Sequence, residues 1–165
     1  MLIDKYTSIV KKNYLDEWGE PLPLSVLDIA CGKGGDLRKW DIAGTRNYYG
    51  VDIAFKAIQD AQSRKLKSFK NFCTNFIQLD ASCPPEEFFA DVPEKMYFDM
   101  VSTQFSMHYM FKSEEKVRNF LQNVSQRLNK GGFFVCTQPD ANVIMKKLRQ
   151  RHEVDEQGRF FTGNK

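Results

Sequence analysis

The 165-residue sequence contains no apolar run close to the roughly 20 residues that a membrane-spanning helix needs. Its N-terminal stretch, MLIDKYTSIVKKNYLDEW, is amphipathic and lacks the continuous apolar segment of a secretory signal. The four cysteines form no C-x-x-C pair, which argues against a zinc site, because zinc ligands usually occur at close spacing. We therefore expect a soluble intracellular protein without a metal, with reduced thiols at Cys31, Cys73, Cys83 and Cys136.

The sequence also lacks a strong excess of charge of either sign. Its formal net charge of +3 is too small to indicate by itself a protein that binds nucleic acid. Hydrophobic residues make up 42% of the sequence, which is enough for a packed core and too much for a disordered chain. At this length we expect one domain, covering residues 1–165.

Short runs of β-forming residues alternate with helical patterns along the chain. The expected strands are SVLDIA at 25–30, NYYGVDI at 47–53, NFIQLD at 75–80, FDMVSTQF at 98–105 and FFVCTQP at 133–139. The expected helices are an N-terminal one at 2–18 and others at 36–43, 54–66, 114–128 and about 140–148. Such alternation predicts an α/β fold with a doubly wound, largely parallel sheet.

The boundaries of the fourth of these helices have local signals. Ser113 is a good N-cap, and two glutamates in the first turn suit the positive end of the helix dipole. We expect Lys130, Gly131 and Gly132 to stop the helix before the last strand begins.

A glycine-rich loop follows the first expected strand directly. Gly32, Gly34 and Gly35 let the backbone turn tightly and approach a ligand, although the spacing is not G-x-G-x-x-G and a plain connection is an equal alternative. Asp52 ends the next strand about 20 residues on, where a carboxylate can accept both ribose hydroxyls of an adenosine. The alternative for Asp52 is a cap on the helix that starts at Ala54.

Asp80 and Ser82 follow the third strand at the same edge of the sheet, where doubly wound folds bind ligands. They are candidates to receive an adenine amino group, and an Asx-type turn before Pro84 carries equal weight. After the fourth strand, the run from Gln104 to Tyr109 gathers amide, aromatic and imidazole groups. These groups suit purine recognition, but a structural histidine and core aromatic rings remain the alternative.

Five segments taken together resemble the eukaryotic mRNA cap (guanine-N7) methyltransferase family. They are VLDIACGKGGDLRKW, YYGVDIA, the Asp80–Ser82 turn, STQFSMHYMF and LNKGGFFVCTQP, in this order, and the resemblance extends from Val26 to about Leu148. The resemblance implies a Rossmann-like fold that depends on S-adenosylmethionine. It implies methyl transfer to N7 of the cap guanine of RNA, with S-adenosylhomocysteine as the product.

The resemblance also implies roles for particular residues. By the resemblance, the residues around S-adenosylmethionine are expected to be Ala30, Asp52, Asp80, Gln104 and Tyr109, and the loops after the first and third strands add Gly32 and Ser82 as candidates. By the resemblance, those around the cap and its phosphates are expected to be Lys33, Lys39, Arg64, His108, Tyr109 and Pro139, and the aromatic run after the fourth strand adds Phe105. Ala30 departs from the family, which usually has glycine there. Because N7 carries a lone pair and no proton, no general base is expected, and His108 and Tyr109 are positioning groups.

Members of this family continue upstream and downstream of the matching segments, so we expect this sequence to be truncated at both ends. The resemblance implies a nuclear protein that binds the capped 5′ end of mRNA and works with other capping enzymes or the transcription machinery, without a membrane; we expect a monomer. Two alternatives stay open. One is a methyltransferase for a small metabolite, and the other is a non-catalytic binding module on the same fold.

Overall fold

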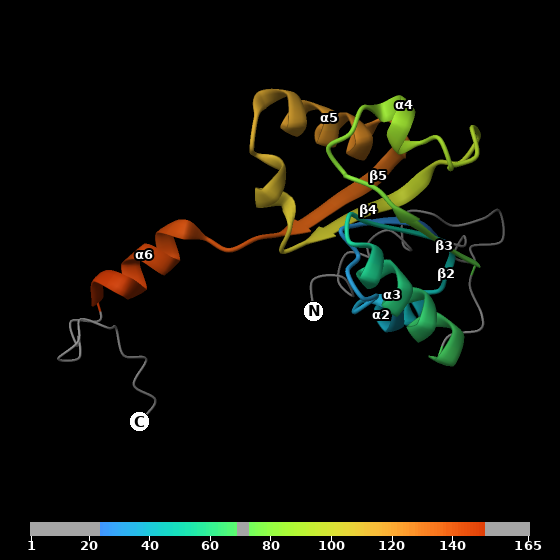
Figure 1. The fold of residues 1–165 in the computed structure, drawn as a ribbon, viewed down its shortest axis with the longest axis horizontal. Helices are drawn as coiled ribbons and strands as arrows, with labels where there is room; N and C mark the ends of the chain where they lie inside the picture. The colour runs from blue at the N-terminus through green and yellow to red at the C-terminus, as the bar shows by residue number, and fades with distance from the viewer. Residues whose placement is uncertain (1–23, 69–72, 151–165) are drawn as a thin grey trace.

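The computed structural model describes residues 24–68 and 73–150. They contain a five-stranded parallel sheet and the helices that flank it (Figure 1). The strands are β1 (Leu24–Ile29), β2 (Thr45–Asp52), β3 (Cys73–Gln78), β4 (Phe98–Gln104) and β5 (Leu128–Thr137). Their order across the sheet is β3-β2-β1-β4-β5. The chain thus builds outward from β1 to β3, returns to the other side of β1 and builds outward again, so the order reverses between β1 and β4.

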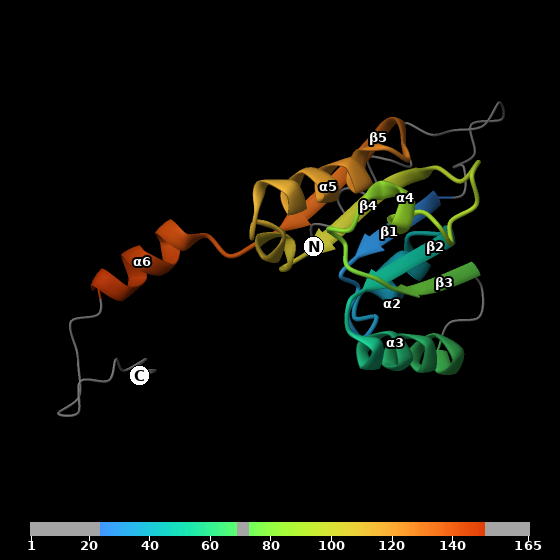
Figure 2. The ribbon, with the colours of Figure 1, turned by 45° about the horizontal axis from the view of Figure 1, so that its top comes forward.

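Helices cover both faces of the sheet, as the sequence predicts for a doubly wound fold. They are α2 (Leu37–Ile42), α3 (Phe55–Ser68), α4 (Pro85–Phe88), α5 (Glu114–Ser125) and α6 (Ala141–Gln150), with a 3₁₀ turn, η1, at Met107–Met110. α2 and α3 lie on one face and α4 and α5 on the other, while α6 projects away from the sheet (Figure 2).

The core consists of two hydrophobic clusters, one on each face of the sheet. Successive side chains of a strand point to opposite faces, and neighbouring residues of β1 accordingly join different clusters. Leu27 packs with Phe98 and Phe120 in the cluster under α5, whereas Val26 packs with Trp40 in the cluster under α2. The two central strands, β1 and β4, are covered on both faces, and all but one residue of each is buried.

The connection between α5 and β5 differs from the expectation. α5 ends at Ser125, and β5 begins at Leu128, so the glycine pair lies inside the strand rather than before it. The strand pairing shifts register here, and Gly131 has φ of +81°, a conformation open to glycine that lets the strand bulge.

Most other predictions of secondary structure are confirmed to within two residues at each boundary. The oxygen of Ser113 accepts a hydrogen bond from the amide of Lys116 at 3.2 Å, which confirms it as the N-cap of α5. The expected N-terminal helix at 2–18 lies outside the described residues.

Asp28, in the middle of β1, is a buried carboxyl that the sequence patterns did not single out. Its Oδ2 accepts hydrogen bonds from the indole nitrogen of Trp40 at 3.2 Å and from the hydroxyl of Tyr48 at 2.9 Å. Burial raises the pKa of Asp28 to about 7, because desolvation outweighs the stabilising effect of these donors on the charged form. The carboxyl links β1 to α2 and β2 inside the core.

We predict that Asp28 makes the protein less stable as the pH rises from about 4 to 7. In this window the folded state holds a proton that the unfolded state has released, so the unfolding free energy falls with rising pH by about 1 kcal/mol per unit and levels off above 7. Asp28→Asn keeps an oxygen acceptor and removes the titration. Urea unfolding across this range should therefore show that the variant gains stability relative to the parent protein as the pH rises, and parallel curves would contradict this.

Candidate functional site

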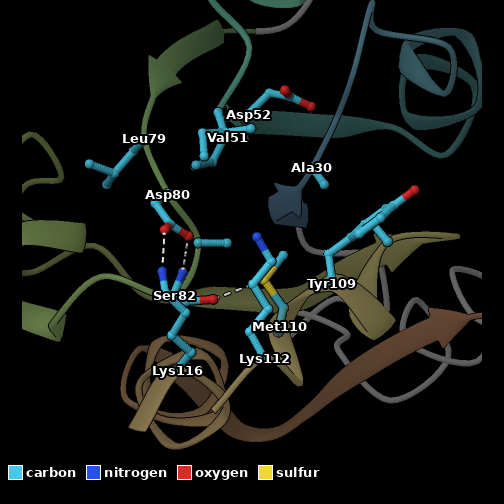
Figure 3. Close-up of a pocket in the computed structure, with 13 residues that line it drawn as sticks. Ala30, Val51, Asp52, Leu79, Asp80, Ser82, Tyr109, Met110, Lys112 and Lys116 are labelled. Carbon is cyan, nitrogen blue, oxygen red and sulfur yellow. Dashed lines mark hydrogen bonds and ion pairs between the residues drawn. The ribbon is translucent and has the colours of Figure 1, made fainter.

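A cavity of about 460 Å³ opens at the edge of the sheet where β1, β2 and β3 end (Figure 3). Its lining comes from the loop after β1, the end of β2, the turn after β3, the η1 region and α5. The cavity lies beside the point where the strand order reverses, which is where open α/β sheets bind their ligands. The predicted residues on its wall are Ala30, Asp52, Asp80, Ser82 and Tyr109.

The loop after β1 has an unusual backbone. Gly32 and Gly34 have φ of +54° and +69°, and Ala30 has φ of +57°, a left-handed conformation that disfavours a side chain. At Gly34 a Cβ would also lie 2.5 Å from the Leu37 side chain, so glycine is required there for space as well. Ala30, the position noted above as a departure from the family's usual glycine, therefore carries strain at the wall of the cavity.

Asp52 is the last residue of β2, and its carboxylate connects the loop after β1 to the start of α3. One carboxylate oxygen accepts a hydrogen bond from the amide of Gly32 at 2.8 Å, and the other from the amide of Ala54 at 2.9 Å. The alternative considered for Asp52, a bond to the start of α3, is thus present. It does not exclude a ligand, because a carboxylate has about four acceptor sites and Asp52 also lines the cavity.

Asp80 forms the opposite wall of the cavity. Its Oδ1 accepts from the amide of Ser82 at 2.8 Å, which is the Asx-type turn considered above, and its Oδ2 pairs with the ammonium of Lys116 at 2.7 Å (Figure 3). Burial alone would raise the pKa of Asp80, but the bonds from Lys116 and Ser82 outweigh it and hold the pKa below its usual value. Asp80 is therefore a fixed carboxylate.

One side of α5 holds the turn that carries Asp80. Lys116, Asn119 and Asn123 follow at spacings of three and four residues, which place them on the same side of the helix. The amide of Asn119 donates to the carbonyl of Ser82 at 3.3 Å, and that of Asn123 donates to the carbonyls of Ala81 and Cys83 at 3.0 and 2.9 Å. α5 thus orients the cavity wall through side chains that the sequence analysis missed.

The segment after β4 contributes only partly to the cavity. Tyr109 lines the cavity. The ring centroids of His108 and Tyr109 lie 4.1 Å apart, the two ring planes are tilted by 43°, and both side chains are exposed. The amide of Gln104 instead pairs with β5, accepting from the Thr137 hydroxyl at 2.8 Å, and Gln104 is absent from the cavity lining. Phe105 has φ of +56° and is 66% exposed, so its ring is held out toward solvent.

The residues expected around the cap phosphates lie outside the cavity lining. Lys33 forms an ion pair with Asp60 at 3.5 Å, and Lys39 pairs with Asp36. Arg64 is exposed on α3, and Pro139 is exposed beyond the end of β5. Several further residues of the lining were not predicted, among them Lys112 and Met110. The sulfur of Met110 accepts a hydrogen bond from the Ser82 hydroxyl at 2.9 Å.

Within residues 24–68 and 73–150 the structure contains no group of three or more His, Cys, Asp or Glu side chains placed to hold a metal ion. In the same part of the chain, no helix combines the length and the apolar character needed to cross a membrane. The four cysteines are free thiols, as expected.

Solved structures with the same fold are methyltransferases. The plantazolicin methyltransferase BpumL in complex with SAH superimposes with a TM-score of 0.62 at 18% identity, over 92% of this chain and 51% of that one. An S-adenosylmethionine-dependent methyltransferase from Clostridium acetobutylicum gives 0.59 at 18% identity, over 81% and 49%. The chain therefore shares the doubly wound, Rossmann-like fold of these methyltransferases.

Sequence similarity assigns the chain to one particular family within this fold. The chain belongs to the family described as mRNA (guanine-N(7))-methyltransferase domain, whose model matches residues 1–161. It is 44% identical over 128 residues to an mRNA cap guanine-N(7) methyltransferase of Schizosaccharomyces pombe, covering 77% of this chain and 35% of the relative. A relative from Arabidopsis thaliana is 44% identical over 132 residues, with 76% and 36% covered. The chain thus spans about a third of the length of these relatives.

Replacing Ala30 with glycine is predicted to stabilise the protein. Glycine removes the cost of the left-handed backbone, about 1 to 2 kcal/mol, and part of this gain is offset by the freedom of glycine in the unfolded chain, which leaves about 0.5 to 1 kcal/mol. Ala43, with φ of −67°, provides the control. Thermal unfolding should show a higher midpoint for Ala30→Gly and a lower one for Ala43→Gly, and a loss in both variants would rule out strain at Ala30.

Replacing Lys116 with methionine is predicted to raise the pKa of Asp80 toward the value set by burial alone, because the bond that favours the charged form is lost. Carboxyl carbon NMR during a pH titration measures this directly. Arg118→Met is the matched control, since Arg118 lies on the same helix and pairs with Glu114 instead. An unchanged Asp80 titration in Lys116→Met would show that the ion pair is not formed in solution.

Proposed function

We propose that this protein is an S-adenosylmethionine-dependent methyltransferase that methylates N7 of the guanine in the 5′ cap of mRNA, releasing S-adenosylhomocysteine. The observation that carries the proposal is the family match across residues 1–161, joined to a cavity with fixed carboxylates on two of its walls. The chain spans only about a third of the length of these relatives. The family match therefore shows its family, and its methyl-transfer activity is our proposal.

The cavity fits an adenosine-containing cofactor. Its volume of about 460 Å³ lies within the usual range of small-molecule sites. Asp52 offers acceptors for the ribose hydroxyls, and Asp80 with Ser82 for the adenine amino group, while Ala30 and Tyr109 border the remainder. Gly32 lies outside the lining and would act through its hydrogen bond to Asp52. Gln104 would join them only by giving up its bond with Thr137. When bound, S-adenosylmethionine supplies an electrophilic methyl group on a sulfonium.

The protein's task in this reaction is alignment. Guanine N7 has a free lone pair in the ring plane and loses no proton when it is methylated, so no side chain needs to act as a base. Tyr109, which lines the cavity, and His108, whose ring is tilted by 43° against that of Tyr109, are suited to hold the purine in line with the methyl group. Phe105 presents a further exposed ring in the same segment. Alignment of this kind contributes several kcal/mol to a transfer reaction.

The remaining cap contacts are electrostatic. Lys33, Lys39 and Arg64 are suited to neutralise the triphosphate of the cap, and Pro139 to border the guanine. Lys33 and Lys39 are paired with carboxylates and must exchange those partners for phosphate. We further propose that the protein acts as a monomer in the nucleus on capped mRNA, together with other capping enzymes or the transcription machinery.

The decisive test is transfer of a labelled methyl group from S-adenosylmethionine to RNA with an unmethylated cap, with N7-methylguanine identified after nuclease digestion. We predict that His108→Ala lowers kcat/KM for capped RNA by about tenfold or more, because small errors in alignment are costly, and leaves the affinity for S-adenosylhomocysteine unchanged. Arg118→Ala, remote from the cavity, is the control. A parallel loss of both properties would make His108 a structural residue, and labelling away from the cap would overturn the proposed function.

A further inference from the structure

The two faces of the sheet differ in the charge of the helices that cover them. Residues 30–68, which include α2 and α3, contain eight Lys and Arg against four Asp and Glu. Residues 80–127, which include α4 and α5, contain five against eight. Because the two pairs of helices lie on opposite faces (Figure 2), one face is basic and the other acidic, although the net charge of the whole sequence is small.

The basic residues of α3 form a line along the outer side of the helix. Lys56, Asp60, Arg64 and Lys67 follow at spacings of four, four and three residues, which place them on the same side. The buried side chains of α3 lie on the other side, toward the sheet. Asp60 is the single acidic residue of α3.

This line begins three residues after Ile53, which lines the cavity. The ammonium groups of Lys33 and Lys56 lie 3.5 and 3.2 Å from the carboxylate of Asp60, which joins the glycine loop to the second turn of α3. The hydrogen bond from Lys56 is the main cause that lowers the pKa of Asp60. From Lys56 to Lys67 the helix rises about 16 Å, enough for a few nucleotides of an extended strand.

A second line of side chains runs next to the basic one. Phe55, Gln59, Gln62 and Leu66 follow at spacings of four, three and four residues, and Phe55 and Leu66 are 59% and 75% exposed. An exposed ring can stack on a base, and amides can bond to base edges, while neighbouring cations bind phosphates. This combination is typical of surfaces that bind single-stranded nucleic acid.

Resting on the proposed function, we propose that the outer side of α3 binds the RNA chain that follows the cap. Lys56 and Lys67 contact its phosphates, and Phe55 stacks on a base, while Arg64 serves the cap. The RNA thereby leaves the site along the basic face and avoids the face of α4 and α5, which together contain four Glu against one Lys and one Arg. The surface adds affinity for longer RNA without sequence specificity, because phosphate contacts and stacking do not read bases.

The test compares binding, by fluorescence anisotropy, of a capped RNA of about ten nucleotides and of a cap dinucleotide. The variant is Lys56→Glu with Lys67→Glu, and the control with the same change of charge is Lys95→Glu with Arg118→Glu, from segments outside α2 and α3. At about 0.15 M salt we expect the α3 variant to bind the longer RNA about tenfold more weakly or worse, with a shallower salt dependence. Dinucleotide binding should stay unchanged, and the control should resemble the parent protein.

Asp60→Asn gives a test in the opposite direction, because it removes the negative charge from the line and should tighten binding of the longer RNA. Equal losses in the α3 variant and the control, or no loss in either, would overturn the inference. The proposed function is tested separately, by measuring whether the parent protein binds capped RNA more tightly than uncapped RNA of the same length. A protein without that preference would refute cap recognition, while the comparison of variants would still decide the role of α3.

Discussion

The Asp52 carboxylate is the interaction on which the arrangement of the site depends. It accepts one hydrogen bond from the glycine loop after β1 and another from the start of α3, so a single side chain joins two crossovers of the fold at the cavity wall. The loop has a backbone that is unfavourable by itself, with Ala30 in a left-handed conformation, and it needs such an anchor. Asp52 also lines the cavity, so the residue that anchors the loop borders the candidate site.

The opposite wall of the cavity, the turn that carries Asp80, is also held in place by side chains, and these come from α5. The turn after β3 has one internal backbone hydrogen bond, from the amide of Cys83 to the carbonyl of Asp80 at 3.0 Å. Three side chains of α5 supply further partners for its carbonyls and for Asp80. A buried or half-buried turn without such partners would carry a large desolvation cost. The stable packing of α5 on the sheet is therefore also what orients Asp80, and stability and ligand recognition share the same helix.

The charge of the helices also differs between the two faces of the sheet. Together α4 and α5 contain four Asp and Glu against two Lys and Arg, whereas α2 and α3 contain two against six and border the glycine loop. A field that is weak when summed over the whole chain can still guide a polyanion when its positive part is gathered on one face. The exposed cations of α3 extend that face away from the cavity.

The alternation of apolar runs and helical patterns determined the α/β class, and the glycine loop, Asp52 and Asp80 were found from the sequence because each directly follows a strand. These features are local, and strand ends in a parallel sheet meet at one edge. The bond between Lys116 and Asp80 joins residues 36 positions apart, and that between Gln104 and Thr137 joins residues 33 apart; no periodicity encodes either of them. The bulge at Gly131 depends on pairing with β4. Tertiary packing decided these contacts because they exist only once the helices are docked on the sheet.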